Sequence, residues 1–228
     1  MLGLDPEGEK LVRTHFLRNS YDGLVSWGWT LSDEASVTMW GRYLYNRFGK
    51  EIFIKTLNSK KIGLAALEEA LKSVSPETSM ASVFAEWVAH NFKTEGQGPR
   101  QTVTVTTDVP GEINDTIEDW SSAGYRFTVE GGVWVTANNT LRVHWQVPSG
   151  EQIKWQGLLE TKSGIKLVEP EGANEAEGTF YITAAPGEIK SLLVMPVSTF
   201  TENGSNGTGR KATLRLTATL IGEMQPYV

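Results

Sequence analysis

The stretch that decides the fold spans residues 27–92, and its densest part reads Met39-Trp40-Gly41-Arg42-Tyr43-Leu44-Tyr45-Asn46-Arg47-Phe48-Gly49. Large apolar side chains recur here at about four-residue spacing, which places them on one face of a helix. They are Val37, Trp40, Leu44 and Phe48. Ser32 is positioned to cap the start of this helix, and Gly49 to end it in a left-handed conformation. The pattern predicts a compact helical core and does not by itself name a function.

Further amphipathic helices are predicted after this one. A short helix covers residues 50–57, and a clearer one carries leucines and a valine at 3-4-3 spacing, namely Leu64, Leu67, Leu71 and Val74. Pro76 stops that helix or opens the next turn, and Ser79 can cap the next helix, which ends near Asn91. Helices joined by such short connections imply a small bundle or layer.

The composition changes at residues 93–100, where helix formers stop and Gly and Pro appear. Beyond this segment the apolar period becomes two, which indicates strands. The alternating segments are 102–106, 125–129, 141–147 and 214–220, and further strands are predicted over 153–159, 178–183 and 191–197. Roughly eight strands separated by turn residues predict an antiparallel β-sandwich of the jelly-roll type. We therefore expect an α+β chain of two domains, an α-helical one over residues 1–93 and a β-sandwich over residues 101–228.

Composition limits the classes of partner. The chain has 228 residues and a formal net charge of −6, from 21 basic and 27 acidic side chains. No strongly basic face is expected, which argues against nucleic acid as a partner. The absence of cysteine excludes disulfides, thiol catalysis and cysteine metal sites. No apolar run approaches the roughly 20 residues of a membrane span.

The sequence lacks recognisable catalytic motifs. Its histidines, His15, His90 and His144, do not lie at metal-ligand spacing, and no His-Glu-x-x-His, P-loop or Gly-x-Ser-x-Gly pattern occurs. His90 falls near a predicted helix end, where the dipole favours a cationic side chain. The adjacent acids Asp33 and Glu34 suit the positive end of the following helix. We therefore predict no catalytic and no metal-binding residue.

Two tryptophans of the predicted sandwich are candidates for carbohydrate stacking. Trp134 and Trp155 could form an aromatic platform, because a flat apolar ring matches the C–H face of a sugar. The alternative interpretation places these side chains in the core of the sandwich.

The helical half resembles the C-terminal helical subdomain of gluzincin zinc metallopeptidases, especially secreted bacterial peptidases of the hyicolysin type. The resemblance covers about residues 20–92. It rests on the aromatic-rich segment that ends in Arg47-Phe48-Gly49, on the leucine-containing segment 63–71 and on the pair Phe84 and Trp87. The sandwich half resembles domains that often follow such catalytic domains.

The resemblance also shows what this chain lacks. The zinc-binding His-Glu-x-x-His helix and the later glutamate ligand would lie upstream of this subdomain, and the chain has neither. A tyrosine that helps to stabilise the oxyanion in many relatives would fall at Glu34, where a carboxylate would repel a developing oxyanion. The resemblance places Trp27, Trp29 and Glu34 nearest the site, in one wall of the substrate cleft. The chain would then be the C-terminal portion of a longer peptidase, or the descendant of one that has lost its chemistry.

Two hypotheses of function follow. The first is a non-catalytic portion of a secreted or cell-surface metallopeptidase-like protein, with a helical cleft wall and an accessory β-sandwich. It needs no cofactor of its own, and zinc is expected only in an upstream catalytic segment. The second is an independent carbohydrate- or protein-binding module at the cell surface. Both predict a peptide or glycan ligand and an extracellular or cell-envelope location, and neither involves nucleic acid or a membrane span.

Overall fold

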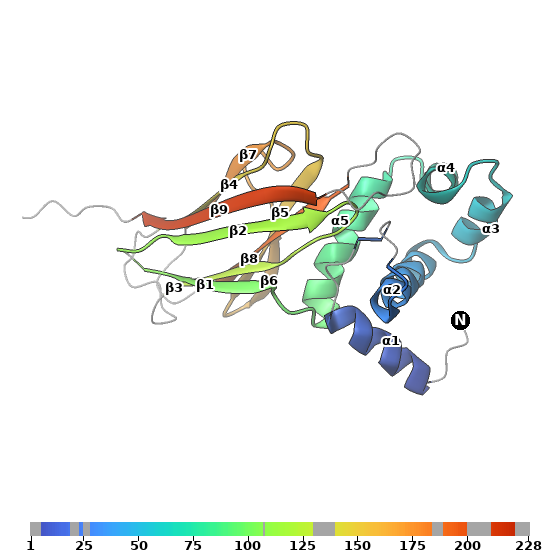
Figure 1. Ribbon diagram of the computed structural model, residues 1–228, viewed down its shortest axis with the longest axis horizontal. Coiled ribbons are helices and arrows are strands. Elements are labelled where there is room, and N and C mark those ends of the chain that lie inside the picture. Colours follow the sequence, from blue (N-terminus) through green and yellow to red (C-terminus); the bar gives the residue numbers. More distant parts are fainter. Residues whose placement is uncertain are drawn as a thin grey trace, which may run out of the picture.

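Helices precede strands along the chain. The computed structural model describes residues 6–18, 23–24, 28–106, 108–129, 140–183, 189–199 and 211–221. The helices are α1 (Pro6–Arg18), α2 (Leu31–Phe48), α3 (Glu51–Asn58), α4 (Gly63–Val74), α5 (Met80–His90) and the π-helix η1 (Asn91–Glu95). The strands are β1 (Gln101–Val105), β2 (Gly111–Glu118), β3 (Tyr125–Val129), β4 (Thr140–Gln146), β5 (Ile153–Thr161), β6 (Gly164–Val168), β7 (Glu177–Thr183), β8 (Ile189–Ser198) and β9 (Lys211–Ile221). This order confirms the predicted α+β fold (Figure 1). None of the described helices is both long and apolar enough to cross a membrane.

The described strands form two sheets, ordered β1-β3-β8-β5-β6 and β2-β9-β4-β7. Neighbours pair antiparallel except β1 and β3, which run parallel with Gln101 opposite Tyr125. This pair departs from the purely antiparallel sandwich that we predicted. Parallel neighbours require a crossover, and here the chain passes through β2 in the other sheet before it returns as β3.

Two of these strands escape the sequence pattern. β2 carries apolar side chains only at Ile113 and Ile117 among polar ones, and β6 is an edge strand whose side chains are largely exposed. β6 buries little surface and so need not alternate between apolar and polar residues. β2 does alternate in burial, but the polar Asp115 stands between its two buried isoleucines and interrupts the apolar pattern. These two strands are therefore recognisable only from the pairing of their backbones.

The sheets enclose a core of large apolar side chains. Trp145 of β4 and Trp155 of β5 stack across it, with ring centroids 4.8 Å apart, and both are 0% exposed. The other large, fully buried side chains of this core include Ile113, Tyr125, Phe127 and Phe180. The sandwich therefore has a core of its own, built from both sheets.

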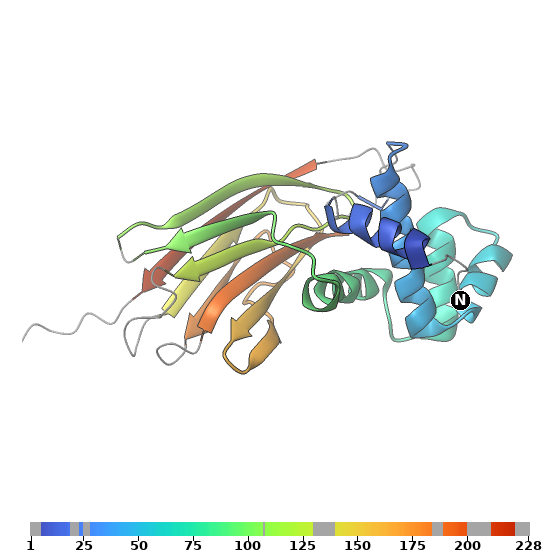
Figure 2. The same ribbon diagram turned by 90° about the horizontal axis from the view of Figure 1, so that it is seen from below.

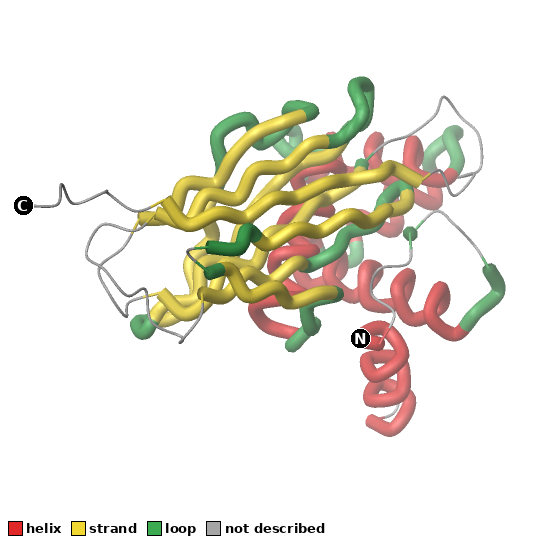
Figure 3. Tube along the Cα trace, turned by 60° about the vertical axis from the view of Figure 1, so that its left-hand side comes forward, coloured by secondary structure: helices red, strands yellow, loops and turns green. Residues whose placement is uncertain are grey.

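Helix α5 packs on the outer face of the first sheet, and the other helices lie beyond it at one end of the sandwich (Figures 1 and 2). Along β8, Leu192 and Val194 point into the sandwich, whereas Leu193, Met195 and Val197 join the core under the helices. Figure 3 shows the helices gathered beside the stacked strands. α5 is bonded directly to the sheet, because the Gln156 side-chain amide donates to the Ala85 carbonyl at 2.8 Å in a buried contact.

Helix α2 differs from its prediction in two details. Its N-cap is Thr30, not Ser32, because the Thr30 hydroxyl and the Asp33 carboxylate form a reciprocal capping box. Val37 is 43% exposed, although we placed it on the buried stripe. The buried face instead includes the small residues Ala35 and Ser36, which a search for large apolar side chains does not count. The predicted N-cap Ser79 and the helix end at Gly49, which has a φ of +72°, are confirmed.

A close contact between Gly124 and Phe92 joins the helical layer to the sheet. A Cβ atom at Gly124 would lie 2.5 Å from two Phe92 ring atoms and 3.2 Å from a methyl of Leu193. We expect Gly124→Ala to lower the free energy of unfolding by about 1–3 kcal/mol, because overpacking forces the neighbours apart. Denaturant unfolding measures this change.

Gly41→Ala in α2 is the matched control. No heavy atom lies within 4 Å of a Cβ built there, and a helical Gly→Ala change is expected to raise stability by about 0.5–1 kcal/mol. Equal effects of the two substitutions would contradict the role of the Phe92 contact.

Candidate functional site

The start of α2 is a tightly bonded turn centred on Asp33. One carboxylate oxygen of Asp33 accepts from the Gly28 amide at 3.1 Å, the Thr30 amide at 2.8 Å and the Thr30 hydroxyl at 2.9 Å. The Asp33 amide donates back to the Thr30 hydroxyl oxygen at 3.3 Å. Asp33 is only 6% exposed, so these bonds are shielded from water and fix the backbone on both sides of Trp29.

Trp29 is held in an unusual conformation inside this turn. Its φ is +59°, in the left-handed region that non-glycine residues seldom adopt. Such a conformation costs on the order of 1 kcal/mol or more, and strained residues of this kind cluster at active sites and ligand clamps. The side chain is 88% exposed. The fold therefore holds a large aromatic side chain at the surface on a strained but well-bonded backbone.

The structure brings together two of the three residues that we placed nearest a cleft. Glu34 is exposed in the first turn of α2, and its amide bonds to the Thr30 carbonyl at 3.4 Å. Trp29 precedes the same turn, whereas Trp27 lies outside the described residues. We had interpreted Asp33 only as a complement to the helix dipole, so its role as the centre of the Trp29 turn is new. The spacing Thr30-x-x-Asp33, a capping-box pattern, is the signal that could have revealed it.

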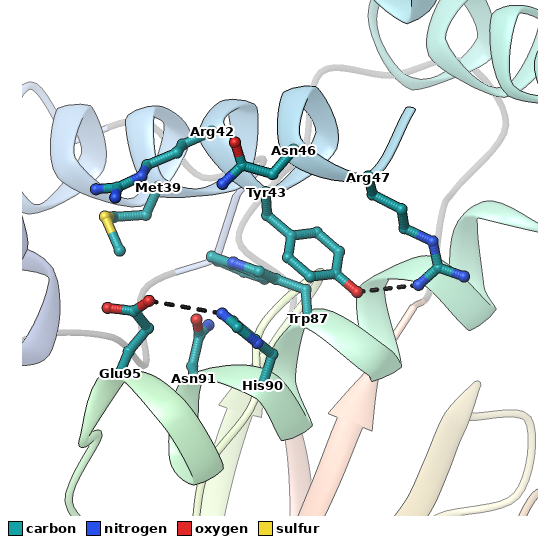
Figure 4. Close-up of a pocket in the computed structure, with 9 residues that line it drawn as sticks. All are labelled: Met39, Arg42, Tyr43, Asn46, Arg47, Trp87, His90, Asn91 and Glu95. Atoms are coloured by element: carbon teal, nitrogen blue, oxygen red, sulfur yellow. Dashed lines mark hydrogen bonds and ion pairs between the residues drawn. The ribbon is translucent and has the colours of Figure 1, made fainter. Parts of the chain in front are cut away.

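A pocket lies between α2 and the end of α5 with η1 (Figure 4). Its volume is about 330 Å³, and its lining residues are Met39, Arg42, Tyr43, Asn46, Arg47, Trp87, His90, Asn91 and Glu95. Aromatic rings form much of the wall, because Tyr43 lies 5.5 Å from the His90 ring between centroids and Trp87 packs against Trp40 behind it. Neither Trp29 nor Glu34 lines this pocket.

The π-helix η1 determines which side chains meet in the pocket. In a π-helix the turn closes over five residues instead of four, so His90 and Glu95 lie one above the other. His90 Nε2 is 3.5 Å from Glu95 Oε1. Arg13 of α1 ties the same carboxylate from outside, with Nε 3.0 Å from Glu95 Oε2, and also donates to the Glu95 carbonyl at 2.9 Å. The sequence places His90 only near a helix end, and its spacing does not reveal this pairing with Glu95.

Arginines at the pocket rim are paired with acids from neighbouring helices. Arg42 pairs with Glu9 of α1, and Arg47 pairs with Glu86 of α5. Arg47 also donates to the Tyr43 hydroxyl oxygen at 3.0 Å. Each of these two arginines at the rim is therefore neutralised by an acidic side chain.

Asn91 is the polar residue of the pocket that the fold leaves incomplete. It is 2% exposed, and its Oδ1 atom has no hydrogen-bond partner among the described residues. A buried acceptor left unpaired costs about 1–3 kcal/mol. Figure 4 shows the Asn91 side chain directed from η1 toward the space under α2.

The expectation that Trp155 stacks on carbohydrate is wrong. Its ring is 0% exposed and is covered by Trp145, because alternate positions of β5 face the interior of the sandwich. Trp134, the other candidate, lies outside the described residues. His144, the histidine of the sandwich half, bonds to the Thr179 hydroxyl at 3.3 Å across β4 and β7. Within the described part of the chain, no group of three His, Asp or Glu side chains is arranged to hold a metal ion.

No family model and no curated protein match this sequence. Among solved structures, the pre-peptidase C-terminal domain of a collagenase from Bacillus anthracis is 15% identical with a TM-score of 0.34, and the match covers 54% of this chain and 97% of that one. The periplasmic inhibitor of g-type lysozyme from Salmonella Typhimurium is 13% identical with a TM-score of 0.30, covering 53% and 99%. The CBM22-1 xylan-binding domain of Paenibacillus barcinonensis Xyn10C is 12% identical with a TM-score of 0.28, covering 50% and 72%. At TM-scores this low, none of these likenesses bears on what this chain binds.

The Asp33 turn makes a direct prediction about stability. Asp33→Ala removes an acceptor from two backbone amides at a nearly buried position, so we expect a loss of about 2–3 kcal/mol in the free energy of unfolding. Glu34→Gln is the matched control, since it removes an exposed carboxylate from the same helix turn and should cost only about 0.3–1 kcal/mol. Denaturant unfolding of both variants provides the test, and equal losses would contradict the central role of Asp33.

Proposed function

We propose that this chain is a non-catalytic, peptide-binding portion of a secreted or cell-surface peptidase-like protein. The start of α2 forms one wall of a cleft for an extended peptide, and the β-sandwich is an accessory unit. The observation that carries this proposal is Trp29, an 88% exposed indole on a left-handed backbone that Asp33 holds in place. The order of the helices supports it, because it follows the resemblance to the gluzincin C-terminal subdomain through Phe48, Gly49 and Trp87.

The chemistry of this wall suits a peptide with apolar and basic side chains. An indole offers a large, rigid apolar surface, and little conformational freedom is lost when a ligand covers it. The exposed carboxylate of Glu34 at the same helix end attracts a Lys or Arg side chain or a peptide amino terminus. At the position where relatives stabilise an oxyanion, that carboxylate gives no such help. The wall thus binds and orients a peptide, and catalysis in a complete peptidase would belong to a segment that carries zinc.

Binding of another protein at the cell surface is a second candidate, favoured by a different observation. The apolar side chains of Ile54 and Leu57 in α3 and of Ile62 before α4 are 42%, 85% and 87% exposed. Exposed apolar groups of this size are typical of protein contacts when they lie together. Binding of carbohydrate instead of protein is poorly supported, because it requires exposed tryptophans on the sandwich. Trp120, Trp145 and Trp155 are at most 5% exposed. Only Trp134 is left to support it.

The division into a domain of residues 1–93 and a domain of residues 101–228 is part of the same proposal. The segment between them contains Gly96 in the left-handed conformation and leads directly into β1. The core under the helices includes Trp120, Leu158 and Met195 of the sandwich half. The helical wall is therefore supported by the sandwich and is expected to move little against it.

Loss of Trp29 tests the cleft wall. We expect Trp29→Ala to weaken binding of the chain to an array of random decapeptides by about tenfold, because the main apolar contact is removed. Leu57→Ala is the matched control, since Leu57 is equally exposed but lies in α3, and it should leave binding within about twofold. An equal loss in both variants, or in Leu57→Ala alone, would favour the exposed α3 surface instead.

Zinc titration tests the non-catalytic part of the proposal. Calorimetry of the chain with Zn²⁺ should show no tight stoichiometric binding, and the chain with Zn²⁺ should not hydrolyse casein. Tight binding of one zinc ion together with peptide hydrolysis would overturn the assignment of catalysis to another segment.

A further inference from the structure

Asn91, in the pocket between α2 and η1, has a side-chain carbonyl oxygen with no hydrogen-bond partner among the described residues. Its backbone is fully bonded: the N–H reaches the Trp87 and Val88 carbonyls, and the C=O accepts from the amides of Gly96 and Gln97. The unpartnered Oδ1 atom is therefore not a sign of a loosely built segment. The side chain sits in well-bonded backbone, is 2% exposed and lines an open pocket.

The charges around the pocket favour an uncharged ligand. Each charged side chain in the lining is already paired: Arg42 with Glu9, Arg47 with Glu86, and Glu95 with both Arg13 and His90. An ionic ligand would lose its hydration in this pocket and would meet no charged side chain that is free to pair with it. Such desolvation of a charge is unfavourable. A neutral polar group meets no such cost if it makes its hydrogen bonds in the pocket.

The remaining walls select a flat group with an apolar body. Met39, Tyr43 and Trp87 supply thioether and aromatic surface on the side of α2 and α5 (Figure 4). A volume of about 330 Å³ is at the small end of ordinary ligand pockets. It suits a single sugar residue or a single amino-acid side chain with its flanking backbone.

We propose that this pocket binds a carboxamide group. A primary amide can make two hydrogen bonds with Asn91 at once, its N–H donating to Oδ1 and its carbonyl oxygen accepting from Nδ2. A trans secondary amide makes one of these two bonds, because its N–H and C=O point in opposite directions. An amide is a neutral, planar group that offers both a donor and an acceptor to another amide. If the Asn91 amide rotates by 180°, so that Oδ1 and Nδ2 exchange places, a ligand amide that rotates in the same way still matches it. The hydrocarbon part of the ligand then lies against Tyr43 and Trp87.

Two sources carry this group, and the test separates them. An N-acetyl amino sugar offers a secondary amide, and an Asn or Gln side chain offers a primary amide. The probes are therefore N-acetylglucosamine and propionamide, with glucose and propionate as controls that lack the amide. The ¹⁵N-labelled wild-type chain is titrated with each probe, and the side-chain NH₂ signals of Asn91 are followed by NMR.

The expected result is a saturable shift of the Asn91 NH₂ signals with at least one amide probe and none with its control. Saturation by N-acetylglucosamine identifies an amino sugar, and saturation by propionamide alone identifies a side-chain amide. Asn91→Leu should weaken that binding by about tenfold or more. Ser36→Ala is the matched control, because Ser36 is also 2% exposed with an unpartnered side-chain oxygen but lies outside the lining. It should leave affinity within about twofold.

Two outcomes would overturn the proposal. One is the absence of any Asn91 shift with both amide probes, and the other is an equal shift with glucose or propionate. The wild-type titration decides between these results even if Asn91→Leu does not fold, since the Asn91 side chain can be assigned through its own backbone signals. Because Trp29 and Glu34 do not line the pocket, a failure here leaves the proposed peptide wall unaffected.

Discussion

Strand β8 is buried on both faces, so it requires the second sheet on one side and the helices on the other. Successive side chains of a strand point to opposite faces, so β8 supplies Leu192 and Val194 to the sandwich and Leu193 and Met195 to the helical layer. Exposing either face to water would be costly, at roughly 25 cal/mol for each Å² of apolar surface. The helices therefore serve as the second cover of a sheet, and the sheet serves as the floor of the helical layer.

This shared floor determines where functional side chains are placed. α5 lies on the sheet, held by the bond from Gln156 to Ala85 and by the contact of Phe92 with Gly124. Because α5 is fixed, its continuation η1 has a defined position opposite α2. The π-helical turn then directs Asn91 and Glu95 toward α2. π-Helical turns are rare and often occur at functional sites.

The two candidate sites have a physical feature in common. At Trp29 a side chain is held on left-handed backbone, and at Asn91 a buried acceptor has no described partner. Each feature has a cost in folding free energy that a more regular residue would avoid. In both places the surrounding bonds, from Asp33 or from the η1 backbone, are strong enough to maintain the arrangement. Local departures of this kind, inside otherwise consistent structure, are where binding functions are expected.

The sequence alone determined the features of the fold that depend on residues close together in the chain. The aromatic helix before Gly49, the cap at Ser79 and the change from helix to strand near residues 93–100 all follow from local spacing and backbone preference. Spacing states which side chains share a face of an element. For this reason it also predicted most strands. It missed β6, whose side chains are largely exposed, and β2, which has only two large apolar side chains among polar ones.

Only the tertiary structure decided which face meets another layer. The spacing could not show that Val37 faces water while Ala35 is buried, or that Trp155 is covered by Trp145 from the opposite sheet. The pocket likewise joins Tyr43 with Asn91 from helices distant in sequence, and His90 meets Glu95 only because the turn is π-helical. These outcomes depend on packing between elements, and periodicity within one element carries no information about what lies against it.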